Sequence, residues 1–128
     1  MERTRVLVAD DDADIRGLLA AFVSSDPSLK LVGVAADADE AIELAAEHKP
    51  DAALLDVAMP GGGGLRVVTE LQSFSPETSV VALSAYDERS IVIDMLQAGA
   101  MSYLVKGATR EQILHALHRS IEAHAKLA

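Results

Sequence analysis

The chain repeats one pattern: a short apolar run, then a longer segment in which apolar residues recur at helical spacing. The apolar runs cover residues 6–9, 31–35, 52–55, 80–83 and 103–105. Short runs without polar alternation are typical of strands whose two faces are both buried. The pattern therefore predicts five buried strands separated by helices.

The first segment between two runs shows the helical spacing most clearly. Its apolar side chains fall at i, i+3, i+4, i+7 and i+8, at Ile15, Leu18, Leu19, Phe22 and Val23. On a helix these positions share one face, which predicts an amphipathic helix with that face turned toward the sheet.

Capping signals place the second and fifth helices. We expect the second helix to start at Asp37, whose carboxylate caps the amide of Glu40 while Glu40 reaches back, and to end near residues 48–50. In the fifth helix, Thr109 and Gln112 have the spacing of a capping box. Its inner face carries Ile113, Leu117 and Ile121.

Proline and glycine bound the other two helices. The third is predicted from about Leu65 to Ser75, because Pro76 disfavours a helical conformation in the residue before it. The fourth is predicted from a cap at Asp87 to Gly99, since glycine suits the left-handed position after a helix end.

Strand and helix thus alternate five times, which predicts an α/β fold with a parallel sheet covered on both faces. In such sheets, ligands bind beyond the carboxyl ends of the strands. Asp10, Asp56, Ser84 and Lys106 all follow or close an apolar run. We therefore expect these polar groups to converge on one edge of the sheet.

Composition limits the function classes. With 128 residues, half of them hydrophobic, the chain fits one domain with a sizeable core, and it has no cysteine for disulfides or thiolate metal sites. A formal charge of −9 disfavours direct binding of nucleic acid by this segment. The first apolar run is too short for a signal peptide or a membrane span, so we expect a cytoplasmic protein with no membrane partner.

Acidic residues suggest a metal site. Asp10, Asp11 and Asp56 would bring several carboxylates together, where their mutual repulsion favours a hard divalent cation, and Mg²⁺ suits such oxygen ligands better than Zn²⁺ does. An acidic pair after a strand caps a helix about as often as it binds a metal, and we assign the capping role to Asp12 and Asp14.

Other metal sites do not match the sequence. A calcium loop starting at Asp10 requires Gly at its sixth position and Glu at its twelfth, where this chain has Ile15 and Ala21. The four histidines are His48, His115, His118 and His124. We interpret them as surface residues of helices with no acid directed at them.

The remaining polar groups have both simple and functional interpretations. Lys106 either forms an ordinary salt bridge at the end of a strand or provides the positive charge that neutralises a carboxylate or a bound phosphoryl group. Ser84 either belongs to a turn or donates its hydroxyl to a phosphoryl oxygen. Residues 61–64 are all glycine, but no Gly-Lys-Ser/Thr follows, so we expect a flexible loop rather than a nucleotide site.

Taken together, these motifs resemble one family. The acidic pair after the first strand, Asp56-x-x-Met59-Pro60, Ser84, and Tyr103-x-x-Lys106 are similar in order and spacing to the receiver domain of bacterial two-component response regulators. The resemblance covers residues 6–121, and residues 97–107 are similar to the NarL/FixJ-like subfamily in particular. It implies a flavodoxin-like (βα)5 fold with strand order 2-1-3-4-5 and one receiver domain over residues 1–128.

The resemblance also implies a role for each motif residue. Asp56 would be the phosphoacceptor, and Lys106 would contact the phosphoryl oxygens. Asp10, Asp11, Asp56 and the backbone carbonyl of Ala58 would hold Mg²⁺. Ser84 and Tyr103 would form a switch pair. Family members often have proline after the lysine, with a cis bond, whereas this chain has Gly107, so the geometry of that turn is left open.

The implied function is that of a phosphoacceptor, not of a turnover enzyme. A sensor histidine kinase would be the partner, and the fourth helix, fifth strand and fifth helix the readout face. The segment would be the N-terminal part of a DNA-binding transcriptional regulator, or a stand-alone phosphorelay receiver, and a homodimer is possible. The competing hypotheses are a haloacid-dehalogenase-like Mg²⁺ phosphohydrolase, with Asp10 as nucleophile and Asp12 as general acid, and a pseudo-receiver that only docks.

Overall fold

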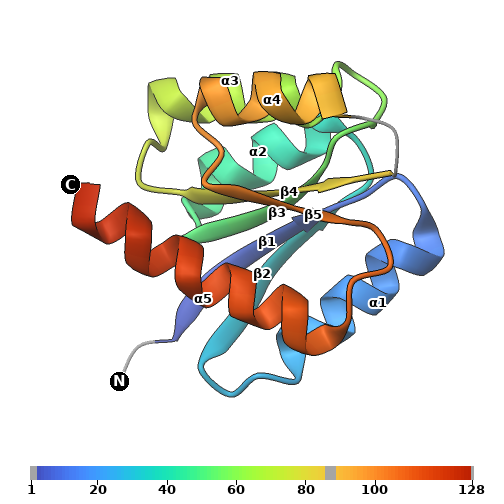
Figure 1. The fold of residues 1–128 in the computed structure, drawn as a ribbon, viewed down its shortest axis with the longest axis vertical. Coiled ribbons are helices and arrows are strands. Elements are labelled where there is room, and N and C mark those ends of the chain that lie inside the picture. The colour runs from blue at the N-terminus through green and yellow to red at the C-terminus, as the bar shows by residue number, and fades with distance from the viewer. Residues whose placement is uncertain (1–2, 86–88, 128) are drawn as a thin grey trace.

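The computed structural model describes residues 3–85 and 89–127, in which five strands alternate with five helices (Figure 1). The strands are β1 (Thr4–Ala9), β2 (Leu29–Ala35), β3 (Ala52–Asp56), β4 (Ser79–Ser84) and β5 (Ser102–Val105). The helices are α1 (Ala13–Ser24), α2 (Ala38–His48), α3 (Gly63–Phe74), α4 (Arg89–Ala98) and α5 (Arg110–Leu127). The predicted order of elements is confirmed.

The strands form one parallel sheet in the order β2-β1-β3-β4-β5, as expected (Figure 1). Helices α1 and α5 cover one face, and α2, α3 and α4 cover the other. Alternate residues of a strand point to opposite faces, so Leu7 packs toward α2 while Val6 and Val8 pack toward α1 and α5. The fold therefore has two hydrophobic cores separated by the sheet.

The prediction of strands buried on both faces holds for three of the five. Every residue of β3 and β4 is buried, as are the last four residues of β1. It is wrong for the two edge strands, where Val34 of β2 and Val105 of β5 are exposed. The helices cover the middle of the sheet more completely than its edges, so an apolar run alone did not reveal this exposure.

One residue of the predicted face of α1 points away from the core. Leu19 and Val23 are buried, and Ile15 and Phe22 pack partly against the core, but Leu18 is 53% exposed. The five apolar positions span a wider arc of the helix than the sheet and α5 cover.

The capping predictions are confirmed with one change. The carboxylate of Asp37 accepts a hydrogen bond from the amide of Glu40 (2.8 Å), and the side chain of Glu40 reaches back to the amide of Ala36, one residue before the cap (2.9 Å). Thr109 and Gln112 cap each other's amides. The predicted cap at Asp87 lies outside the described residues.

A histidine pair was not expected. His118 of α5 lies with its Nε2 atom 2.9 Å from Oδ2 of Asp26, in the turn between α1 and β2. This hydrogen bond, aided by those from Ser28, lowers the pKa of Asp26 to about 2. The interpretation of His118 as a residue without an acid directed at it is therefore wrong.

Within the described part of the chain, no helix is both long and apolar enough to cross a membrane.

Replacing Asp37 with Ala should lower the free energy of unfolding by about 1 kcal/mol, because the amide of Glu40 loses its cap at the start of α2. Urea denaturation followed by circular dichroism measures this change. Glu43→Ala, which removes an exposed acid from the middle of the same helix, is the control. Equal stability of Asp37→Ala and the wild type would contradict the prediction.

Candidate functional site

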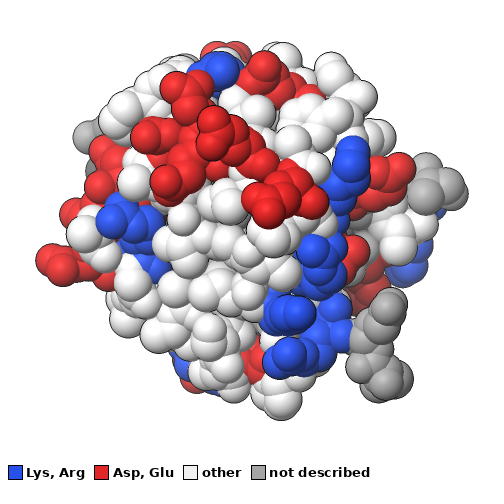
Figure 2. Space-filling model, turned by 180° about the vertical axis from the view of Figure 1, so that it is seen from behind, with Lys and Arg blue, Asp and Glu red and all other residues white. Residues whose placement is uncertain are grey.

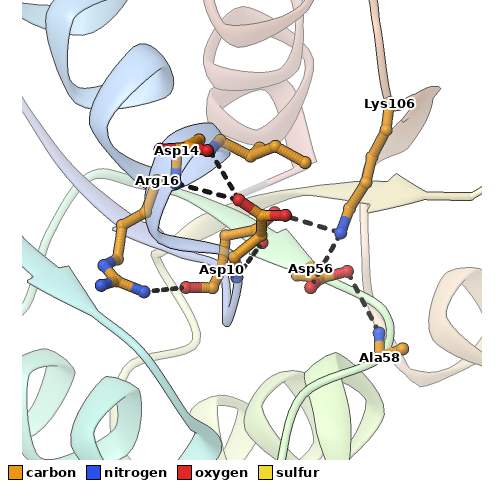
Figure 3. A network of polar contacts seen from close by, with 8 residues as sticks. Asp10, Asp14, Arg16, Asp56, Ala58 and Lys106 are labelled. Atoms are coloured by element: carbon orange, nitrogen blue, oxygen red, sulfur yellow. Dashed lines mark hydrogen bonds and ion pairs between the residues drawn. The ribbon is translucent and has the colours of Figure 1, made fainter.

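Two buried carboxylates meet a lysine at the carboxyl edge of the sheet (Figure 3). Asp10 follows β1 and Asp56 ends β3, and both residues are completely buried. The Nζ atom of Lys106, just after β5, lies 3.3 Å from Oδ2 of Asp10 and 3.0 Å from Oδ2 of Asp56. The sheet thus brings together three of the residues that were predicted to converge.

Local hydrogen bonds fix Asp10. Its Oδ1 atom accepts from the amide of Asp12 (2.9 Å), and its backbone carbonyl accepts from Nη1 of Arg16 (2.9 Å). Asp12 in turn caps α1 by accepting from the amides of Asp14 and Ile15, as predicted, whereas Asp14 lies in the first turn of the helix and supplies only an amide to this cap. Sequence reasoning missed Arg16. The available signal was its position one turn after Asp12, from which an arginine can reach back to the end of β1.

The two residues that follow Asp56 fix its position. The amide of Val57 donates to the carbonyl of Leu83 on β4 (2.9 Å), and the amide of Ala58 donates to Oδ1 of Asp56 (3.2 Å). The remaining oxygen, Oδ2, faces Lys106 (Figure 3). One oxygen of Asp56 is therefore fixed by its own loop, while the other faces the centre of the site.

Burial dominates the electrostatics of the site. It raises the pKa of Asp56 to about 7, against the lowering effect of Lys106 and with a further raising effect of the charge on Asp10. Burial alone would lower the pKa of Lys106, but its contacts with Asp56 and Asp10 raise it above the ordinary value. The negative charge of this site is thus only partly balanced by the lysine.

The acids fit a hard divalent cation. Asp10, Asp11 and Asp56 each offer a carboxylate oxygen, and these oxygens lie within 4.8 Å of one another. The Oδ2 atoms of Asp10 and Asp56 are buried and accept no hydrogen bond from the described residues, with only the ion pair to Lys106 beside them. An all-oxygen set with exposed Asp11 at its rim leaves room for water ligands, which is the arrangement Mg²⁺ prefers.

Ser84 and Tyr103 lie along one groove between α4 and β5. Ser84 ends β4 and is buried, whereas Tyr103 is 51% exposed. They line a cavity of about 420 Å³ together with Val92, Ile93 and Leu96 of α4. The ring of Tyr103 is therefore on the outer side of the sheet edge in this structure, with space beside it.

Gly107 settles the geometry left open after Lys106. The described residues contain no cis peptide bond, and Gly107 has a φ of +97°. Proline, whose ring fixes φ near about −65°, does not adopt this conformation. The turn after Lys106 therefore requires glycine in this chain.

Comparison with known proteins now identifies the family. A family model described as the response regulator receiver domain matches residues 6–118. The chain is a response regulator receiver domain. It is 40% identical over 116 residues to the transcriptional regulatory protein NarL of Mycobacterium tuberculosis, an alignment that covers 91% of this chain and 54% of NarL. It is 31% identical over 123 residues to the transcriptional regulatory protein LiaR of Bacillus subtilis, covering 96% of this chain and 58% of LiaR.

Solved receiver domains have the same fold. The receiver domain of NarL from Mycobacterium tuberculosis matches with a TM-score of 0.90 and 38% identity, covering 95% of this chain and 98% of that one. The response regulator domain of Thermotoga maritima CheB matches with a TM-score of 0.86 and 30% identity, covering 94% and 98%. The receiver domain described here thus spans nearly all of those domains but about half the length of NarL and LiaR.

Replacing Asp56 with Asn should stabilise the metal-free receiver domain more at pH 8 than at pH 4. The folded carboxyl has a pKa of about 7 instead of 3.8, so its ionisation destabilises the fold increasingly as pH rises between these values. We expect a gain on the order of 2 kcal/mol at pH 8 and little gain at pH 4. Urea denaturation at the two pH values measures it. Asp14→Asn is the control, and an equal effect of Asp56→Asn at both pH values would contradict the prediction.

Proposed function

We propose that Asp56 accepts a phosphoryl group from a phosphohistidine of a sensor histidine kinase. The single observation that carries this proposal is the buried contact of Lys106 with Asp56 and Asp10, at 3.0 and 3.3 Å. A buried carboxylate with an ammonium group beside it combines a nucleophile with a positive charge for the incoming phosphoryl oxygens. The relatives named transcriptional regulatory proteins and the family match support the same reading.

In the transfer, an oxygen of ionised Asp56 attacks phosphorus opposite the histidine nitrogen. A P–O bond forms, the P–N bond breaks, and the imidazole keeps the electron pair. Lys106 offsets the negative charge of the phosphoryl oxygens. When Mg²⁺ is bound by Asp10, Asp11, Asp56 and the carbonyl of Ala58, it supplies further neutralisation of that charge. The proposed chemistry is modification of the domain itself rather than turnover of a substrate.

The output would pass through the groove of Ser84 and Tyr103. An aspartyl phosphate brings additional negative charge and acceptor oxygens, to which the Ser84 hydroxyl can donate. The cavity beside Tyr103 offers space for its ring if Ser84 moves. If the phosphorylated domain favours that arrangement, the population shifts toward it, and the surface of α4, β5 and α5 changes.

We further propose that this segment, over residues 1–128, is the N-terminal receiver domain of a DNA-binding transcriptional regulator in the cytoplasm. The names and greater length of its relatives support this, whereas a stand-alone phosphorelay receiver is the alternative. Figure 2 shows acidic side chains gathered over the upper left part of one face, with a group of Lys and Arg side chains on its right side. The formal charge of the whole chain is −9, which disfavours binding of phosphates, so DNA binding would belong to another domain. Homodimerisation of this receiver domain stays a prediction.

The competing phosphohydrolase finds less support. It needs Asp12 as a general acid, but the carboxylate of Asp12 is engaged by the amides of Asp14 and Ile15 at the start of α1. A pseudo-receiver is disfavoured because the acids and Lys106 are all present and in contact.

Incubation with acetyl phosphate and Mg²⁺ should add one phosphoryl group to the wild type, counted by intact mass. Asp56→Asn should take up none, and Lys106→Ala should be labelled at least about tenfold more slowly, because a charge that stabilises the transition state is lost. Asp14→Asn, an acid-to-amide change outside the carboxylate cluster, should be labelled like the wild type. Labelling that persists in Asp56→Asn would refute the assignment.

Mg²⁺ should raise the melting temperature of the wild type, because a ligand that binds only the folded state stabilises it by mass action. The effect should be largely lost in Asp11→Asn, in which one of the three carboxylates is removed. Differential scanning calorimetry over a Mg²⁺ series measures this, with Asp14→Asn as the matched control. A shift of the same size in Asp11→Asn would argue against the proposed ligand set.

A further inference from the structure

The loop between β3 and α3 has unusual backbone freedom for a segment beside a reactive carboxylate. Gly61, Gly62 and Gly63 have φ values of +88°, +110° and +67°. A glycine-rich loop has many alternative conformations in the unfolded and locally opened states, so ordering it is costly. Contacts from elsewhere in the fold must therefore hold residues 57–62 in one conformation.

Arg66, in the first turns of α3, lies across this loop. A Cβ atom at Gly62 would come within 2.9 Å of Cδ and 3.0 Å of Cβ of Arg66. A Cβ atom at Gly61 would lie 3.6 Å from Nη1 of the same side chain. The absence of side chains at these two positions gives the arginine stem a path over the loop.

The guanidinium group of Arg66 joins three elements. Its Nη1 atom donates to the backbone carbonyl of Gly61 (2.8 Å) and to Oδ1 of Asp39 on α2 (2.6 Å). Its Nε atom lies 3.4 Å from Oε2 of Glu70, one turn further along α3. Because the guanidinium is planar, one side chain can serve several acceptors in a fixed orientation. Arg66 thus ties the loop to both α2 and α3.

The backbone completes the same attachment. The amide of Ala38, at the start of α2, donates to the carbonyl of Pro60 (3.0 Å). The amides of Gly63 and Gly64 donate to the carbonyls of Met59 and Val57, each at 3.0 Å. Around Ala58, the loop carbonyls at 57, 59, 60 and 61 are therefore all occupied. The carbonyl of Ala58 accepts from none of the described residues.

We propose that Arg66 is a positioning residue, which clamps the loop of residues 57–62 against α2 and so holds the carbonyl of Ala58 beside Asp56 for the metal ion. The clamp itself follows from the contacts of Arg66, Asp39 and Gly61. Its consequence for the metal rests on the function proposed above for Asp56 and Mg²⁺.

Amide hydrogen exchange measured by NMR tests the clamp directly. The amides of Ala38, Gly63 and Gly64 report opening of the loop, because each donates to a loop carbonyl. In Arg66→Ala they should exchange roughly fivefold faster than in the wild type, with core strand amides unchanged. Asp39→Asn should have a smaller effect in the same direction, and Arg66→Lys should fall between, since it keeps the charge but not the planar fork.

Arg110→Ala is the matched control. The side chain of Arg110 is 40% exposed, against 41% for Arg66, and its removal changes the net charge equally. It contacts Ser25 and Glu111, away from the loop. Isothermal titration with Mg²⁺ should then give a dissociation constant a few times higher for Arg66→Ala and unchanged for Arg110→Ala.

The outcomes separate the two proposals. Exchange rates in Arg66→Ala equal to those of the wild type or of Arg110→Ala would overturn the clamp, even if the wild type is phosphorylated. Faster exchange with unchanged Mg²⁺ affinity would overturn the positioning of Ala58. A wild type that neither binds Mg²⁺ nor takes up label would overturn the proposed function, and with it the metal half of this inference, while the exchange rates would still decide the clamp.

Discussion

The buried contact between Lys106 and two carboxylates is the constraint on which the site depends. Ionised carboxylates are costly to bury unless a positive charge or a metal accompanies them. Asp56 ends β3 and Asp10 follows the neighbouring strand β1, whereas Lys106 follows β5, on the far side of β4, and reaches both acids with its long side chain. Its own amide is fixed by the carbonyl of Ser84 (2.8 Å). The parallel sheet in this strand order brings all three to one edge, so the site depends on β1, β3 and β5 together.

Close packing around Asp56 requires glycine at positions 63 and 64. A Cβ atom at Gly64 would lie 2.7 Å from the carbonyl of Asp56 and 2.8 Å from Cε of Met95, and one at Gly63 would collide with the carbonyl of Val57. The first turn of α3 therefore packs directly on the backbone of the carboxylate strand, with α4 behind it. In the adjoining loop, Val57 and Met59 are buried in the core, and backbone hydrogen bonds together with Arg66 hold the glycine-rich part that follows them.

Local and periodic features were predictable from the sequence, and tertiary pairings were not. The caps at Asp37 and Thr109 depend on residues three positions apart, and convergence at the carboxyl edge follows from parallel strands. By contrast, apolar periodicity does not report how much of a helix its neighbours cover, so Leu18 was assigned to the core. The pairs of His118 with Asp26 and of Arg66 with Asp39 join residues 92 and 27 positions apart, and no spacing rule connects them.

Charge balance links the metal, the phosphate and the switch in the proposed function. Three carboxylates face one ammonium group, so with all of them ionised the site carries two excess negative charges, which one divalent cation cancels. Conversion of Asp56 to an aspartyl phosphate replaces a single charge by about −1.5 to −2, so the excess returns. Additional donors then become favourable, and Ser84, which ends β4 beside β3, carries a hydroxyl at the same edge of the sheet. A change in charge at Asp56 can therefore alter the groove that Ser84 shares with Tyr103.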